Sequence, residues 1–205
     1  MIGGASNTGK STWGIEIAYR LGIRNIVHTD TLRNTLRATL ERRKHPALFL
    51  SSYQCWRPYA KTYNPAALAR GFHDQSKLVA KAIRAVVQDA EDYGKFTLIE
   101  GMHVTPSLLD SLKGKHSYTQ VFLLDVSREE TLRKRLEDRC ESTYLNRSAS
   151  KYSGVFPEFK TLRERLVRDA KKKSVPVVSN ETHEQTLAEI MKHLFDGLDR
   201  ILKKS

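Results

Sequence analysis

Short apolar runs alternate along the chain with longer stretches in which apolar residues recur at helical spacing. The runs typical of buried strands are NIVHTD (25–30), KFTLIEG (95–101), YTQVFLLDV (118–126) and VPVVSN (175–180). In the stretches between them, apolar positions recur every three or four residues, which is the period of an amphipathic helix. This period predicts helices over 10–22, 31–43, 75–89, 127–139 and 158–173, and from Thr182 onward.

Strands that alternate with helices predict right-handed β-α-β units and a parallel sheet. The chain is therefore expected to have an α/β fold, with ligands bound outside the carboxyl ends of the strands. Before the first predicted helix only residues 1–3 are available for a strand, so either the first strand is very short or the sequence begins late in that strand.

The stretch GGASNTGKST (3–12) has the spacing of a phosphate-binding loop, G-x-x-x-x-G-K-S from Gly4 to Ser11. In such a loop, backbone N–H groups and the following helix N-terminus face a polyphosphate. Lys10 would reach the β- and γ-phosphates and the Ser11 hydroxyl would bind Mg²⁺. The alternative is a glycine-rich turn that merely precedes a helix. The residues assigned to nucleotide binding here are Gly4, Ala5, Ser6, Asn7, Thr8, Gly9, Lys10, Ser11 and Thr12.

Acidic residues end the third and fourth predicted strands. Mg²⁺ bound to a nucleotide usually needs such a residue near the hydroxyl of the loop. Glu100 and Asp125 compete for this role, and Glu100 is favoured because Gly101 after it permits close approach of a ligand. Asp125 precedes a helix start and is interpreted as structural.

Asp30 ends the second predicted strand. A carboxylate that faces the γ-phosphate could orient the acceptor hydroxyl or take its proton. The alternative is that Asp30 or Thr31 only caps the next helix. Arg33, one turn onward, is placed to meet an anionic group of the substrate, unless it shares a solvated helix face with Arg37.

Composition narrows the class of protein. A chain of 205 residues suits one domain, and its formal net charge of +12 indicates an anionic partner. Two cysteines, Cys55 and Cys140, cannot form a disulfide framework and fit a reducing compartment. No apolar run approaches the length of a membrane span, about 18 residues. Met1 lies too close to Gly4 for a signal peptide. These features predict a soluble cytoplasmic protein without a membrane partner; they do not predict its oligomeric state.

Two segments are expected to cover the ligands. Residues 31–75 read as a substrate-binding insertion, because 45–75 mixes aromatics, prolines and hydroxyls without regular periodicity. Residues 135–158 read as a lid: from 127 to 173 there are fourteen Lys or Arg against eight Asp or Glu. A basic segment that closes over polyphosphate would neutralise transition-state charge and exclude water. Its candidate cations are Arg135, Arg139 and Arg147.

The assembled motifs resemble those of the 2-phosphoglycerate kinase family of phosphate-loop kinases. The resemblance rests on GGASNTGKST, HTDTLR, SSYQCWR, GFHDQS, LIEGMHVTP, RSASKY and VPVVSN, in this order, and covers residues 3 to about 190. It implies a three-layer P-loop NTPase fold with a five-stranded parallel sheet of order 2-3-1-4-5. It also implies that Glu100-Gly101 ends the third strand, that Arg135 and Arg139 open the lid, and that adenine lies near Asn180.

The family's activity implies ATP and Mg²⁺ as cofactors and an alcohol group as the phosphoryl acceptor. The substrate would be 2-phosphoglycerate, giving 2,3-bisphosphoglycerate; relatives that act as mevalonate 3-phosphate 5-kinases leave a second acceptor open. Lys10, Asp30 and Arg139 are the expected catalytic residues. The expected acceptor-binding residues are Asp30, Arg33, Ser52, Tyr53, Trp56, Arg57, Gln75, Glu100, His103 and Arg147.

A second class of function is a nucleic-acid-binding ATPase or polynucleotide end-kinase. It would need a continuous basic track with exposed aromatic residues. The basic surplus here lies in the predicted lid, whereas the aromatics cluster around 53–63, so nucleic acid is not the expected partner. A nucleotide-dependent switch is disfavoured because the chain lacks an evident N-K-x-D signature for reading guanine.

Overall fold

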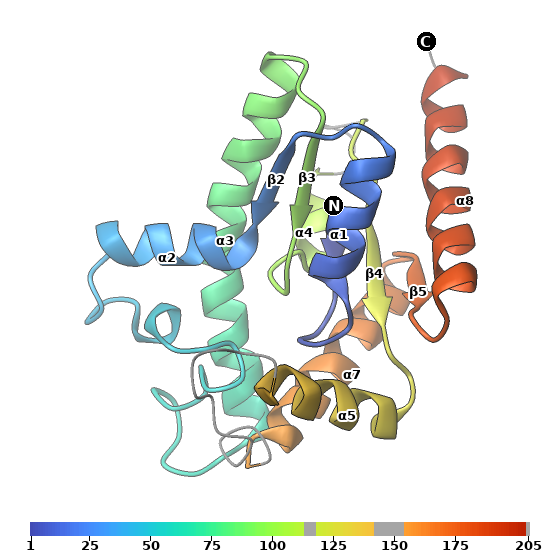
Figure 1. Cartoon of the computed structure of the whole chain (residues 1–205). Helices are drawn as coiled ribbons and strands as arrows, with labels where there is room; N and C mark the ends of the chain where they lie inside the picture. Colours follow the sequence, from blue (N-terminus) through green and yellow to red (C-terminus); the bar gives the residue numbers. More distant parts are fainter. Residues whose placement is uncertain (113–117, 142–153, 204–205) are drawn as a thin grey trace.

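The computed structural model describes residues 1–112, 118–141 and 154–203. Within these ranges, five parallel strands form one sheet of order β2-β3-β1-β4-β5 (Figure 1). The strands are β1 (Ile2–Gly3), β2 (Asn25–His28), β3 (Thr97–Glu100), β4 (Phe122–Asp125) and β5 (Val177–Ser179). The helical elements are α1 (Lys10–Arg20), α2 (Thr29–Thr39), the 3₁₀ turn η1 (Pro46–Phe49), α3 (Pro65–Asp92), α4 (Pro106–Leu112), α5 (Glu129–Glu141), α7 (Phe156–Lys172) and α8 (His183–Leu202). The predicted α/β class and strand order are confirmed.

The central strand β1 is only two residues long. Ile2 is in register with Glu100 of β3 on one side and with Phe122 of β4 on the other. The loop that follows β1 therefore leaves the sheet between the ends of its two neighbours.

Alternate strand residues divide the core between the two faces of the sheet. Leu98 and Leu124 belong to a buried cluster with residues of α1 and α8. Their neighbours Ile99 and Leu123 belong to clusters on the opposite face, with residues of α3, α4 and α7. This alternation is the period of two that a strand imposes. It makes a three-layer arrangement with helices on both faces, which agrees with Figure 1.

Two local predictions are wrong. The helix after β2 begins at Thr29 with His28 as its N-cap, so Asp30 lies in the first turn and caps nothing. Residues 65–75, assigned to an irregular insertion, form the first turns of α3. The Asn64 side chain accepts hydrogen bonds from the first amides of this helix, and Pro65 stands at its first position, so the helix start is stabilised locally.

The proposed insertion 31–75 thus consists of most of α2, the turn η1, a connecting segment and the start of α3. The proposed lid 135–158 combines the end of α5 with the start of α7. Its residues 142–153 lie outside the described part of the chain.

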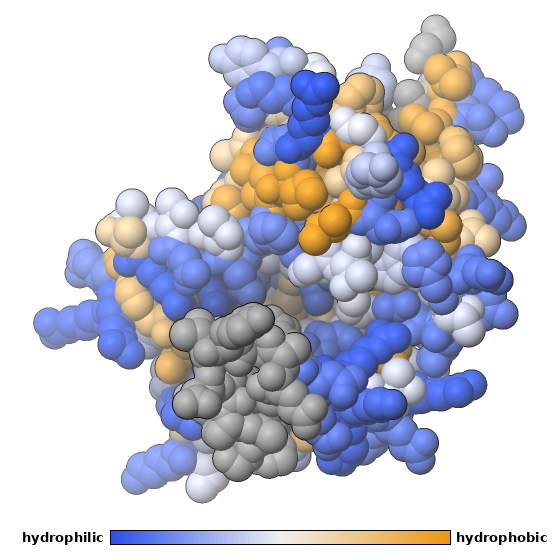
Figure 2. Space-filling view, viewed as in Figure 1, coloured by the Kyte–Doolittle hydropathy of each residue, from blue (hydrophilic) through white to orange (hydrophobic). Residues whose placement is uncertain are grey.

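Apolar side chains reach the surface mainly over α1 and α8. Ile15 of α1 is 61% exposed, and Leu21 after the helix is also exposed. On α8, Phe195 and Leu198 are exposed as well. In Figure 2 hydrophobic surface gathers over the upper part of the molecule, where α1 and α8 lie in Figure 1. No helix in the described ranges has the length and apolar character needed to cross a bilayer.

The turn after β3 leaves no space for a side chain. The Gly101 backbone has a φ of +145°, and its amide donates to the Ile2 carbonyl at 3.0 Å. A Cβ atom placed on Gly101 would overlap the Thr29 side chain. Glycine at this position therefore allows the ends of β2 and β3 to come together.

Replacing Gly101 by Ala should destabilise the fold by about 3 kcal/mol, from backbone strain and overpacking together. Gly22→Ala is the matched control, since Gly22 also has positive φ but no atom lies within 4 Å of the added Cβ. The control should lose only about 1 kcal/mol. Urea unfolding followed by circular dichroism measures both; equal losses would contradict the packing argument.

Candidate active site

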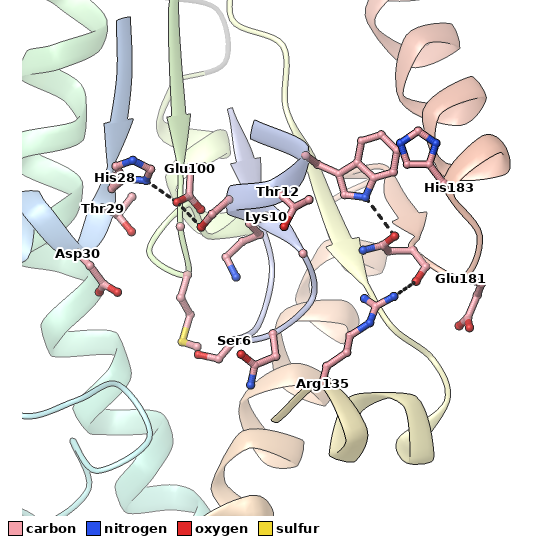
Figure 3. A pocket seen from close by; sticks show the side chains of 17 residues that line it. Ser6, Lys10, Thr12, His28, Thr29, Asp30, Glu100, Arg135, Glu181 and His183 are labelled. Carbon is pink, nitrogen blue, oxygen red and sulfur yellow. Dashed lines mark hydrogen bonds and ion pairs between the residues drawn. The ribbon is translucent and has the colours of Figure 1, made fainter. Parts of the chain in front are cut away.

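A cavity of about 750 Å³ opens at the carboxyl ends of the strands (Figure 3). Its walls come from the loop after β1, the start of α1, the ends of β2 and β3, α5 and the segment after β5. The predicted site residues that line it are Ser6, Asn7, Gly9, Lys10, Ser11, Thr12, Asp30, Glu100, Arg135 and Asn180. Residues from six separate segments thus meet around one cavity.

The phosphate-binding loop has the backbone that its glycines predict. Gly4 and Gly9 have positive φ angles of 135° and 90°, and Asn7 between them has a φ of 62°. A Cβ at Gly4 would overlap the Leu124 carbonyl. The loop can therefore run this close to β4 only if residue 4 is a glycine. The Lys10 Nζ donates to the Ala5 carbonyl at 2.5 Å, which holds this ammonium group inside the curl of the loop.

Glu100 and Asp125, the two carboxylates that compete for the metal, have different partners. The buried Glu100 accepts a hydrogen bond from the Ser11 hydroxyl at 2.9 Å, and its same oxygen lies 2.5 Å from His28 Nδ1. Asp125 instead forms a two-pronged ion pair with Arg163 of α7, at 2.6 and 2.7 Å. The hydrogen bond with Asp125 raises the pKa of Arg163. Asp125 is therefore committed within the protein, and Glu100 lies beside the loop.

Asp30 stands at the edge of the cavity, and its side chain is 73% exposed. Arg33, one turn later on α2, lies 3.5 Å from the Asp30 carboxylate and also donates to the Leu50 carbonyl. The guanidinium is largely buried, whereas the carboxylate remains open to solvent. Asp30 is thus a solvent-accessible acceptor across the cavity from Lys10 (Figure 3).

Asn180 joins the segment after β5 to the phosphate-binding loop. Its Nδ2 donates to the Thr8 carbonyl at 2.8 Å, and its Oδ1 accepts from Trp13 Nε1 at 3.0 Å. Its backbone carbonyl accepts from Arg135 at 3.0 Å, and the Trp13 ring stacks on His183 (Figure 3). Both ends of the Asn180 amide are engaged by protein atoms, which makes it a clamp on the loop.

Several predicted acceptor residues lie away from the cavity wall. Ser52, Gln75 and His103 are buried, and both Ser52 and His103 are hydrogen-bonded to the Gln75 side chain. Trp56 and Arg57 line a separate hollow of about 660 Å³.

Of the three remaining predicted residues, Tyr53 is the one whose side chain the structure describes. The Tyr53 ring packs against Phe159. Arg139 lies on α5, but its side chain is outside the described part of the structure, and so is the whole of Arg147.

Other lining residues were not assigned from the sequence: Trp13, His28, Thr29, Gly101, Met102, Glu181 and His183. The strand-end rule could have found His28 and Thr29, since they lie at the end of the second predicted strand, next to Asp30. Trp13 has the spacing of a core residue, and only the tertiary fold brings it beside Asn180.

The fold and the loop define a P-loop nucleotide-binding protein. Over 98% of its length the chain is 31% identical to a protein named 2-phosphoglycerate kinase from Thermococcus kodakarensis, of which it covers 67%. The chain belongs to the 2-phosphoglycerate kinase family.

Other relatives carry the same name. The chain is 34% identical to 2-phosphoglycerate kinase from Methanopyrus kandleri and 32% identical to that from Pyrococcus furiosus, in each case over 100% of its own length. It covers 64% and 66% of these relatives, so it spans slightly less than two thirds of their length. No protein-family model matches the chain.

The clamp predicts a specific loss on substitution. Asn180→Ala removes the donor to Thr8 and should weaken ATP binding roughly tenfold, because the loop loses a buried bond that holds its shape. Trp13→Phe is the comparison variant: it removes the bond to Oδ1 and part of the buried ring but keeps the bond to Thr8, so it should weaken binding less. Isothermal titration of each variant with ATP measures the effect, and an unchanged affinity in Asn180→Ala would refute the clamp.

Proposed function

We propose that this chain is an ATP-dependent kinase that transfers the γ-phosphoryl group to the free hydroxyl of 2-phosphoglycerate, giving 2,3-bisphosphoglycerate. The observation that carries the proposal is one cavity lined by the phosphate-binding loop, by Glu100 and by the open carboxylate of Asp30. The names of the relatives support the choice of acceptor. They give no support to mevalonate 3-phosphate or to a polynucleotide end as the acceptor. The cytoplasmic location stays a prediction.

The nucleotide half of the cavity suits a triphosphate with a divalent cation. The loop amides and Lys10 would hold the phosphates, with Arg135 at the mouth. The Ser11 hydroxyl and the Glu100 carboxylate are 2.9 Å apart and offer the oxygen ligands that Mg²⁺ prefers, so these residues fit such an ion. When bound, the ion would neutralise charge on the phosphate oxygens.

The acceptor half would be centred on Asp30, which lines the cavity, whereas Arg33 lies behind Asp30 and is not one of the lining residues. Asp30 would orient the acceptor hydroxyl or take its proton, and Arg33 would meet a carboxylate or phosphate of the substrate. Arg57, Arg139 and Arg147 remain proposed contacts of the substrate anions. Catalysis would come from positioning and charge stabilisation, because phosphoryl transfer requires no covalent intermediate here.

The purified chain should consume ATP with Mg²⁺ when 2-phosphoglycerate is supplied. Phosphorus NMR should identify 2,3-bisphosphoglycerate as the product, and mevalonate 3-phosphate and 3-phosphoglycerate serve as competing acceptors. Lys10→Ala should abolish turnover while circular dichroism stays unchanged, because this ammonium acts on the phosphates. Turnover with another acceptor alone, or undiminished turnover in Lys10→Ala, would overturn the proposal.

Asp30→Asn should lower kcat by at least about a hundredfold, since the amide cannot take the hydroxyl proton. The dissociation constant for ATP should change less than about twofold, because Asp30 contacts only the acceptor in this scheme. Asp199→Asn, an exposed carboxylate on α8, is the control. Parallel losses in kcat and ATP affinity would assign Asp30 a structural role instead.

A further inference from the structure

A buried set of polar side chains connects the insertion to the edge of the cavity. Its members are Ser52, Gln75, His103 and Thr29, of which Gln75 and His103 are 0% exposed. They come from four segments: the stretch after η1, α3, the turn after β3, and the first residue of α2. Only Thr29 reaches the cavity wall, next to Asp30 (Figure 3).

The donors and acceptors of this network can be assigned from geometry. Gln75 Nε2 lies 2.9 Å from the carbonyl oxygens of Ala47 and Leu50, so this nitrogen donates both of its hydrogens. Gln75 Oε1 must then be an acceptor, and it accepts from Ser52 Oγ at 2.7 Å. The contact from His103 Nε2 to the same oxygen, at 2.9 Å, therefore requires a proton on Nε2.

His103 is neutral in this position. Its pKa is lowered to about 3, chiefly by burial; the nearby cations Arg33, Lys10 and Arg37 also lower it, and the Asp30 carboxylate acts in the opposite direction. A neutral imidazole protonated on Nε2 has an acceptor at Nδ1. Thr29 Oγ1 lies 3.2 Å from Nδ1 and must donate its hydrogen there. Each hydrogen bond in the series from Leu50 through Gln75 and His103 to Thr29 thus has a defined donor and a defined acceptor.

The segment of the insertion around Leu50, which Gln75 binds, is also held by side chains of α2. The Leu50 carbonyl accepts from Arg33 and Arg37 at 3.3 and 3.1 Å, in addition to Gln75. On its other side, Thr29 is in close contact with Gly101. The first turn of α2 is therefore fixed both to the insertion and to the end of β3.

We propose that Gln75 and His103 are positioning residues that act through Thr29 to hold Asp30 in place against the insertion. The inference rests on the proposed function and deepens it: these side chains do not touch the acceptor, but they set the geometry of the carboxylate that does. Thr29 is the first residue of α2, and Asp30 directly follows it. The hydrogen bond from Thr29 to His103 therefore holds the residue next to Asp30 at the start of the helix.

Isosteric variants test this role in the full chain. Thr29→Val keeps the shape but removes the hydroxyl, and His103→Leu removes its partner. Each should lower kcat/KM for 2-phosphoglycerate at least tenfold, while the dissociation constant for ATP changes less than twofold. Thr29→Ser keeps the donor and should restore kcat/KM to within about threefold of the wild type.

The double variant Thr29→Val/His103→Leu decides between coupling and independent effects. Because the two side chains share one bond, the double variant should be no worse than the poorer single variant. Multiplicative losses would overturn the inference, and so would a loss of ATP affinity parallel to a loss of thermal stability. An equal loss in Thr29→Ser would also overturn it, since the hydroxyl would then not be the essential group.

The protonation of His103 can be measured without any turnover. Nitrogen-15 NMR of the wild type, assigned with His103→Gln, should show the Nε2-protonated neutral tautomer from pH 5 to 8. An imidazolium or an Nδ1-protonated ring in this range would overturn the network. A wild type that transfers no phosphate to 2-phosphoglycerate would overturn the proposed function, whereas an active wild type with unaffected variants would overturn this inference alone.

Discussion

The carboxylate of Glu100 joins three segments that lie far apart in the sequence. One of its oxygens accepts from Ser11 at the start of α1 and contacts His28 at the end of β2. Burying a carboxylate to this degree destabilises the fold unless polar groups contact it. The fold is therefore stable only if the loop and the ends of β2 and β3 meet at Glu100. The same arrangement suits a cation: the Ser11 hydroxyl and the Glu100 carboxylate would hold it, and its positive charge would compensate the buried carboxylate. The order of the sheet makes this meeting possible, because the two-residue strand β1 runs beside β3 and in register with it.

Local sequence could predict the loop, the alternation of strands and helices, and the strand-end carboxylates, because spacing and periodicity encode each of them. It could not decide between Glu100 and Asp125 on firm grounds. That choice depends on Arg163, which lies 38 residues beyond Asp125 and reaches it only through the packing of α7 on β4. The start of α2 was misplaced for a related reason: Thr29 and Asp30 read as the last residues of the strand, whereas α2 begins at Thr29, whose side chain packs against Gly101 after the neighbouring strand. The family motifs indicated Ser52, Gln75 and His103 as functional, and their burial changes what that function can be.

Net charge is a poor guide to which cations meet the substrate. The chain carries +12, yet several of its arginines are already occupied by protein groups. Arg163 pairs with Asp125, Arg37 donates to the carbonyls of Leu48 and Leu50, and Arg135 donates to Asn180. Guanidinium groups are suited to this work because their forked donors can satisfy several carbonyls at once. Of these three arginines, Arg135 alone lines the cavity, and there it stands with Lys10 as a cationic group that favours anionic ligands.

The two halves of the cavity share a principle of construction. Asn180 holds the phosphate-binding loop and Gln75 with His103 holds the start of α2, and all three are neutral groups with several polar contacts to the protein. A charged residue in either place would have to be desolvated and would add to or subtract from the field that acts on the phosphates. Neutral amides and a neutral imidazole fix geometry without altering that field. The charged groups that act on the ligands are then held at the cavity itself: Lys10 by the Ala5 carbonyl, Glu100 by the Ser11 hydroxyl, and Asp30 opposite the Arg33 guanidinium.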